Sequence, residues 1–64
     1  MYNLVGQDGN AYSLMGYTAE AMRECNCSQG HIDEVMKNAK GGDYDNLIFV
    51  LDEEIQRLNY GEVS

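Results

Sequence analysis

The feature that most constrains the fold is an uninterrupted apolar stripe in the last third of the chain. Within residues 43–59, apolar side chains recur every three or four residues, the spacing that places them on one face of an α-helix. The members of this stripe are Tyr44, Leu47, Ile48, Leu51, Ile55 and Leu58. Asp43 is a suitable N-cap, and Glu53 precedes Arg57 by the spacing that favours an ion pair along a helix. The sequence therefore predicts a helix over residues 43–59.

The same periodicity predicts two earlier helices, separated by glycine-bearing breaks. Apolar positions with helical spacing run through residues 10–26, with Asn10 as the N-cap, and through residues 28–40, with Ser28 as the N-cap. In the second of these stretches the acidic residues come first and the lysines last, an order that complements the helix dipole. The chain is therefore predicted to be mainly α.

The first six residues are typical of a short β-strand, with Tyr2 and Leu4 on one face. A lone strand leaves its backbone donors and acceptors unpaired, which is costly unless they meet water or a partner. The strand at residues 1–6 is therefore expected to pair with a minimal C-terminal strand in the tail of residues 60–64, to pair with its copy in a second subunit, or to remain an extended arm. The predicted fold is one three-helix domain over residues 1–64, in the order β-α-α-α.

Chain length limits what such a domain can do. A chain of 64 residues buries only a small core, which makes a walled-off active site implausible. Phe49 and Val50 lie beside the apolar stripe of the last helix and widen it beyond what one small monomer buries. We therefore expect a homodimer that is not an enzyme and that holds no cofactor.

The charge of the chain excludes some partners. Eleven acidic residues against four basic ones give a net charge of −7, which repels nucleic-acid phosphates and anionic membrane surfaces. No apolar run approaches the ~20 residues that cross a bilayer, and no secretion signal is recognisable. A cytoplasmic protein with reduced thiols is expected, without direct nucleic-acid or membrane binding.

Three soft metal ligands lie close together in the sequence, at Cys25, Cys27 and His31. A disulfide across the single residue between the two cysteines would be strained. Structural zinc sites use four ligands and usually a C-x2-C spacing, which this segment lacks. A cysteine nucleophile needs an electropositive neighbourhood, whereas acidic residues surround this one. These three residues are therefore weak candidates for a metal site, and a structural role explains them better.

The acidic residues are unevenly distributed, since residues 43–64 hold six acids and only one base. On a helix, many of them are expected to project from the solvent side around the aromatic ring of Phe49. Such a negative surface with an apolar anchor suits a positively charged groove of a partner protein. The predicted partner-binding residues are Asp45, Phe49, Asp52, Glu53, Glu54 and Gln56.

Two motifs give the chain a resemblance to known proteins. Residues 6–12 have the pattern G-x-D-G-N-A-aromatic, and residues 42–47 have the pattern G-D-Y-x-x-L at the start of the last helix. In both, the chain resembles short acidic proteins encoded by bacteriophages, prophages and mobile elements. The resemblance implies an inhibitor of a bacterial host protein, such as an anti-CRISPR or anti-restriction protein, whose acidic surface imitates DNA.

Two other functions remain open at this point. One is a dimer that binds a small molecule or a signalling nucleotide in a pocket lined by Tyr12, Tyr17 and Phe49. A nucleotide would need cationic contacts, for which the candidates are Arg23, Lys37, Lys40 and Arg57. The other is a structural accessory subunit whose only role is assembly.

Overall fold

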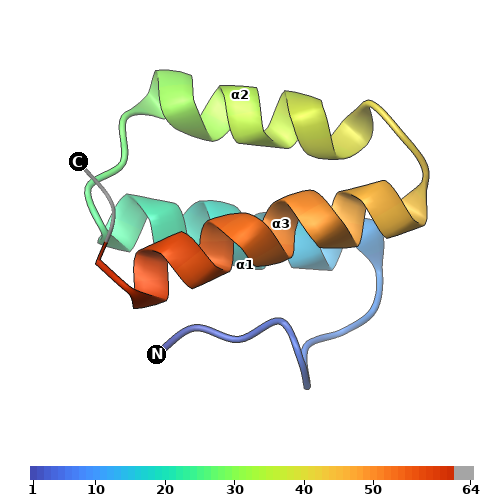
Figure 1. Cartoon of the computed structure of the whole chain (residues 1–64), viewed down its shortest axis with the longest axis horizontal. Coiled ribbons are helices and arrows are strands. Elements are labelled where there is room, and N and C mark those ends of the chain that lie inside the picture. The colour runs from blue at the N-terminus through green and yellow to red at the C-terminus, as the bar shows by residue number, and fades with distance from the viewer. Residues whose placement is uncertain (62–64) are drawn as a thin grey trace.

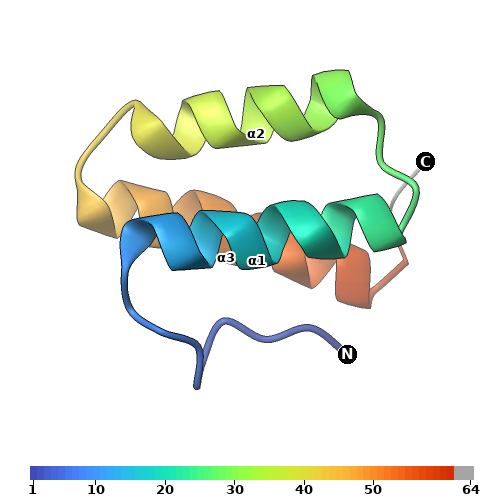
Figure 2. The same ribbon diagram turned by 180° about the vertical axis from the view of Figure 1, so that it is seen from behind.

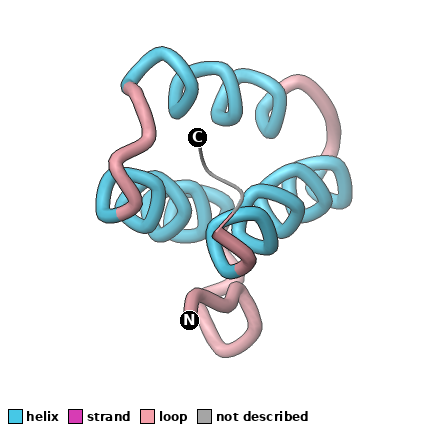
Figure 3. The backbone as a smooth tube through the Cα atoms, turned by 60° about the vertical axis from the view of Figure 1, so that its left-hand side comes forward, coloured by secondary structure: helices cyan, strands magenta, loops and turns pink. Residues whose placement is uncertain are grey.

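The computed structural model of the chain describes residues 1–61, in which three helices surround a common core (Figure 1). Helix α1 spans Ala11–Glu24, α2 spans Gln29–Lys40 and α3 spans Tyr44–Asn59. α1 and α3 lie side by side, α2 covers one side of this pair, and residues 1–10 run along the other side (Figures 2 and 3). The predicted three-helix domain is confirmed.

Each helix starts one residue later than predicted because the capping residue stands just outside it. Asn10, Ser28 and Asp43 all have extended backbones. Their side-chain oxygens accept hydrogen bonds from backbone N–H groups two or three residues further on, which satisfies donors that the first helical turn leaves free. The first helix also ends two residues earlier than predicted, at Glu24.

The core consists of the apolar faces that the three helices turn toward one another. Its largest fully buried side chains include Met22 of α1 and both Leu51 and Ile55 of α3. Thr18 is also fully buried, and its hydroxyl donates to the carbonyl oxygen of Leu14 at 2.9 Å, so its polar group is satisfied within α1. The remaining buried apolar residues are Leu14, Ala19, Ala21, Ile32, Val35, Ala39, Leu47 and Leu58.

The predicted strand at residues 1–6 is wrong. Within residues 1–61 no segment forms a strand, and the first ten residues form a loop with a turn (Figure 3). The side-chain amide of Asn59 takes the place of a neighbouring strand: its Oδ1 accepts from the backbone N–H of Tyr2, and its Nδ2 donates to the carbonyl of Tyr2, both at 2.7 Å. The next backbone N–H, that of Asn3, donates to the hydroxyl of Tyr17 at 2.9 Å.

The inside-outside alternation predicted for this segment is nevertheless present. Tyr2 and Leu4 are half-buried against the core, whereas Asn3 and Val5 are exposed. A turn then closes with a hydrogen bond from the N–H of Gln7 to the carbonyl of Leu4 at 3.1 Å. Residues 1–10 are called the N-terminal segment below. The predicted C-terminal strand falls mostly on residues 62–64, which lie outside the described residues, and Tyr60 and Gly61 form a turn.

Both connections between helices depend on particular residues. At the end of α1, Asn26 has a left-handed backbone with φ of 64°, which lets the N–H of Cys27 donate to the carbonyl of Met22 at 3.0 Å. Between α2 and α3, a Cβ atom at Gly42 would lie 2.8 Å from that of Asn46. Asn46 donates in turn to the carbonyl of Asn38 at 3.0 Å and so ties the end of α2 to α3.

Candidate functional site

The outward side of α3 presents acidic and polar side chains around one exposed aromatic ring. Phe49 is 65% exposed, although it is a large apolar residue. Each of positions 45, 49, 52, 53 and 56 lies three or four residues from another member of the set, so they share this side of the helix. The side chains of this surface, called the α3 acidic face below, are Asp45, Phe49, Asp52, Glu53 and Gln56, all exposed.

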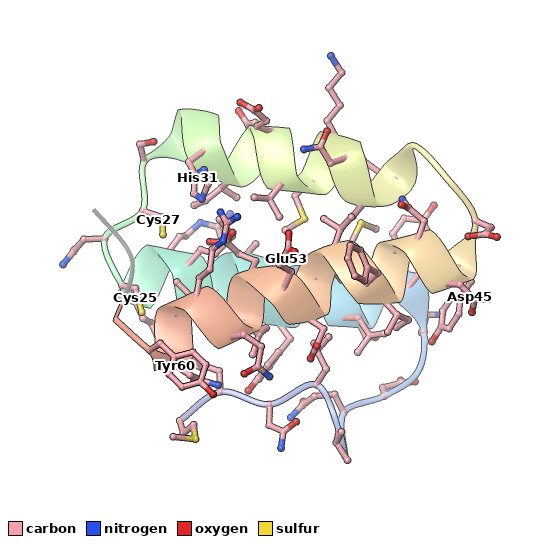
Figure 4. The ribbon with its side chains drawn as sticks, viewed as in Figure 1. Cys25, Cys27, His31, Asp45, Glu53 and Tyr60 are labelled. Carbon is pink, nitrogen blue, oxygen red and sulfur yellow. The ribbon has the colours of Figure 1, made fainter. Side chains whose placement is uncertain are left out.

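The α3 acidic face carries three carboxylates and little compensating charge. Figure 4 shows Asp45 near the start of α3 and Glu53 further along, on the side that faces α2. Within the described residues, the one ion pair on this face joins Glu53 to Arg57, with 4.0 Å between the nearest nitrogen and oxygen atoms. Such a long, exposed pair is weak, so the face stays strongly negative.

The prediction that Glu54 belongs to this solvent side is wrong. Glu54 is only 4% exposed and lies between α2 and α3. The physical reason is visible in the spacing, because position 54 follows Leu47 by seven residues and Leu51 by three, which places it on the inner side of α3. A charged residue at a core position was the signal in the sequence for a buried polar group.

Glu54 is the centre of a cluster of ionisable groups. Its Oε2 lies 3.2 Å from Nε2 of His31 on α2, a distance at which the imidazole N–H donates to the carboxylate. Its Oε1 lies 3.9 Å from NH1 of Arg57, too far for a hydrogen bond. A buried carboxylate needs such partners, because an unpaired buried charge is costly. The pairing of His31 with Glu54 was not anticipated.

A cavity of about 220 Å³ opens over this cluster between α2 and α3. We call it the α2–α3 cavity. Charged side chains from both helices line it, and two valines supply its apolar wall. The lining residues are His31, Glu34, Val35, Asn38, Val50, Glu53, Glu54 and Arg57. Glu53 belongs to both the cavity and the α3 acidic face, so the two are continuous.

The candidate metal ligands do not form a site. Cys25, Cys27 and His31 lie at the end of the molecule where α1 leads into α2 (Figure 4), but His31 pairs with Glu54, and Sγ of Cys25 lies 4.0 Å from the hydroxyl of Tyr2. Among residues 1–61, no group of three or more His, Cys, Asp and Glu side chains is arranged to hold a metal ion. Both thiols are free.

The environment of Cys27 disfavours a thiolate. Burial raises the pKa of its thiol, and the nearby carboxylate of Glu54 and then the neighbouring Cys25 raise it further. A reactive cysteine needs the opposite, a positive neighbourhood that lowers the pKa. Cys27 is therefore a protonated thiol at neutral pH, which does not suit a nucleophile.

The three aromatic residues considered for a ligand pocket have different surroundings. Tyr12 lines a groove of about 340 Å³ at the starts of α1 and α3 and the end of α2, together with Met15, Lys40 and Tyr44. Tyr17 contacts the N-terminal segment, with its ring edge-on to that of Tyr2 at 6.4 Å between centres. Phe49 projects from the α3 acidic face.

Within the part of the chain that is described, no helix has both the length and the apolar composition needed to cross a membrane. Comparisons with protein-family models, with curated proteins and with solved structures found no match to this chain.

Proposed function

We propose that this chain is a small, non-enzymatic binding protein that docks onto a basic protein through the α3 acidic face and blocks it. The observation that carries this proposal is the exposed ring of Phe49, surrounded by Asp45, Asp52 and Glu53 on one side of a rigid helix. Binding hot spots are often aromatic side chains near the centre of an interface whose rim is polar.

Charge and aromatic ring have separate roles in this proposal. The three carboxylates attract a positively charged surface and speed its approach, an effect that the net charge of −7 reinforces over longer distances. Burial of Phe49 in an apolar pocket of the partner then supplies most of the affinity. A partner with a basic rim around an apolar pocket fits both features.

The blocking role rests on the resemblance to acidic bacteriophage proteins. A bacterial nuclease holds DNA in a basic groove, and a helix that carries carboxylates along one side competes for the same groove. We therefore propose a DNA-binding defence protein of the bacterial host as the class of partner, with the protein acting in the host cytoplasm.

Charge reversal on the α3 acidic face tests the proposal. The triple variant Asp45→Lys, Asp52→Lys and Glu53→Lys is expected to lose the basic partner in affinity capture from bacterial lysate. Its matched control reverses three exposed acids elsewhere, Asp8, Glu20 and Asp33, and is expected to keep the partner. Retention by the first variant, or equal loss by both, would contradict the proposal. Circular dichroism checks that each variant is folded.

Phe49→Ala separates the apolar anchor from the charge. We expect partner affinity to fall at least about 30-fold, because hot-spot truncations cost about 2 kcal/mol or more. The association rate is expected to change little, since the carboxylates remain. Surface plasmon resonance distinguishes these effects, and an unchanged dissociation rate would show that the ring is not the anchor.

A nucleotide-binding function is the second candidate, and the groove at Tyr12 favours it. Tyr12 and Tyr44 offer aromatic faces and Lys40 a cation for a phosphate group. Thermal shift against a panel of nucleotides tests it, because a ligand that binds only the folded state raises the melting temperature. Sedimentation of the chain, measured with and without the nucleotide that raises the melting temperature most, then tests whether the chain forms a homodimer and whether the nucleotide changes its oligomeric state.

A further inference from the structure

We propose that the α2–α3 cavity receives the guanidinium group of one arginine side chain from the basic partner. This inference rests on the proposed function and makes it more specific, since the cavity adjoins the α3 acidic face at Glu53. In the proposed complex, the guanidinium forms an ion pair with Glu54 at the inner end of the cavity. Glu34 on α2 and Glu53 on α3 flank the entering side chain.

The size of the cavity suits a side chain. Its volume of about 220 Å³ is several times the ~30 Å³ that one water molecule takes up in the liquid. Val35 and Val50 line it from opposite helices and provide apolar surface for the methylene groups that carry a guanidinium. A phosphate or another anion does not suit it, because three carboxylates surround the space and outnumber the cations.

The hydrogen-bonding capacity of Glu54 is only partly used. A carboxylate accepts about four hydrogen bonds, but within the described residues Glu54 has one such partner, Nε2 of His31 at 3.2 Å. Its other oxygen, Oε1, has Arg57 at 3.9 Å, beyond hydrogen-bond distance. An incoming guanidinium presents its N–H groups in a planar fork that matches a carboxylate. Arginine therefore fits this site better than lysine does.

Arg57 occupies this space loosely and competes with the incoming arginine. Its side chain is half-exposed, and its two contacts with carboxylates measure 3.9 Å and 4.0 Å. Such contacts are weak and hold a flexible side chain poorly. Arg57 must therefore swing toward solvent when the cavity fills. Removal of the Arg57 side chain is therefore expected to strengthen the binding of an arginine in the cavity. A cluster with a purely structural role predicts no such gain in affinity.

The test uses N-acetyl-arginine methylamide as the probe, titrated into the ¹⁵N-labelled chain at low salt and followed by NMR. We expect saturable shifts confined to the amides of residues 31–38 and 50–57, with a dissociation constant on the order of 1 mM, as suits a fragment of this size. The matched citrulline compound has the same shape without the charge and is expected to produce no saturable shift. The lysine compound is expected to bind several-fold more weakly.

Variants decide which groups hold the probe. Glu54→Gln is expected to weaken binding about tenfold, because a charge-assisted hydrogen bond becomes a neutral one. Arg57→Gln is expected to strengthen it several-fold by removing the competitor. Glu20→Gln removes an equal charge from an exposed site on α1 and is expected to change nothing. If Glu54→Gln does not fold, the exposed pair Glu34→Gln and Glu53→Gln replaces it, with the same expected direction.

Three results overturn the proposal: no saturable shift, equal shifts with citrulline, or weaker binding by Arg57→Gln. The outcome is separable from that of the proposed function. A probe that fails to bind, while reversal of the α3 acidic face still abolishes partner capture, removes the cavity and leaves the docking face. A probe that binds as expected, while reversal of that face has no effect, supports the guanidinium site and removes the proposed function.

Discussion

The three helices and the N-terminal segment are held in place by different forces. The helices share a core of apolar side chains, with Leu51 fully buried at its centre. The N-terminal segment contributes only half-buried Tyr2 and Leu4 to that core. Its backbone is held instead by side chains of the helices, through the amide of Asn59 and the hydroxyl of Tyr17.

This difference shows how a short chain can hold a terminal segment in place when no strand is there to pair with it. Backbone groups need hydrogen-bond partners, but the partners need not be backbone. Few apolar contacts and a handful of polar ones give a region a low free energy of local opening. We therefore expect the N-terminal segment to detach at a lower free energy than the helices unfold, and the following predictions test that order.

The largest effect is expected from Leu51→Ala. Leu51 is 0% exposed, and truncation of such a side chain leaves a cavity that costs about 2–5 kcal/mol. The whole domain is expected to unfold at lower urea concentration, the N-terminal segment with it. Val5→Ala is the control in the segment: Val5 is exposed, and its loss is expected to change the free energy of unfolding by less than about 0.5 kcal/mol.

Asn59→Ala is expected to release the N-terminal segment while the helices stay folded. The variant leaves the backbone N–H and carbonyl of Tyr2 without their partners. The free energy needed to detach the N-terminal segment is therefore expected to fall by about 1–3 kcal/mol. Hydrogen exchange of the first residues measures it, and unchanged exchange there would refute the proposed attachment. Asn59→Asp sharpens the test, because the carboxylate still accepts from Tyr2 but no longer donates to it.

The connection after α1 offers a contrast, since there the backbone satisfies its own groups. Asn26 adopts the left-handed conformation that glycine takes without strain. Asn26→Gly is therefore expected to leave the free energy of unfolding unchanged or to raise it by up to about 1 kcal/mol. Asn26→Ala is expected to lower it by about 1 kcal/mol. Urea unfolding of the two variants measures this, and an equal effect of both would contradict the role assigned to the turn.

The smallest effect is expected at high pH. The pKa of the Tyr2 hydroxyl is raised, first because it donates a hydrogen bond to Glu24 at 2.8 Å, and then by burial and by Cys25. At a pH between the ordinary pKa of tyrosine and the raised one, the Tyr2 hydroxyl therefore keeps its proton in the attached segment and loses it in the detached segment. Its attachment is complete below the ordinary pKa of tyrosine, about 10, and weakens as the pH rises above that value. Phenolate absorbance, compared between the chain and Tyr2→Phe, follows this loss.

The helices were predictable because each carries its own signals. Apolar periodicity and the three capping residues specify them without long-range information. The alternation of Tyr2 and Leu4 with exposed neighbours was also predictable, but the partner of that segment was not. Asn59 lies 57 residues away in the sequence from Tyr2, and no local pattern shows that its amide substitutes for a strand.

The candidate site was predictable in the same limited way. The exposed positions of the α3 acidic face follow from helical spacing on α3 alone. Glu54 was predicted to face solvent because its side chain is charged. Its spacing from Leu51, however, marks the inner side of the helix, where it is buried. The pairing with His31 depends on how α2 packs against α3, and that is a tertiary contact.

The attachment of Tyr2 to Asn59 has a mechanical consequence. Because it joins the beginning of the chain to the end of α3, a pulling force applied between residues 2 and 59 loads these two hydrogen bonds before it reaches the helices. A single-molecule stretching trace is therefore expected to show a small early yield, followed by the rupture of the bundle at higher tension.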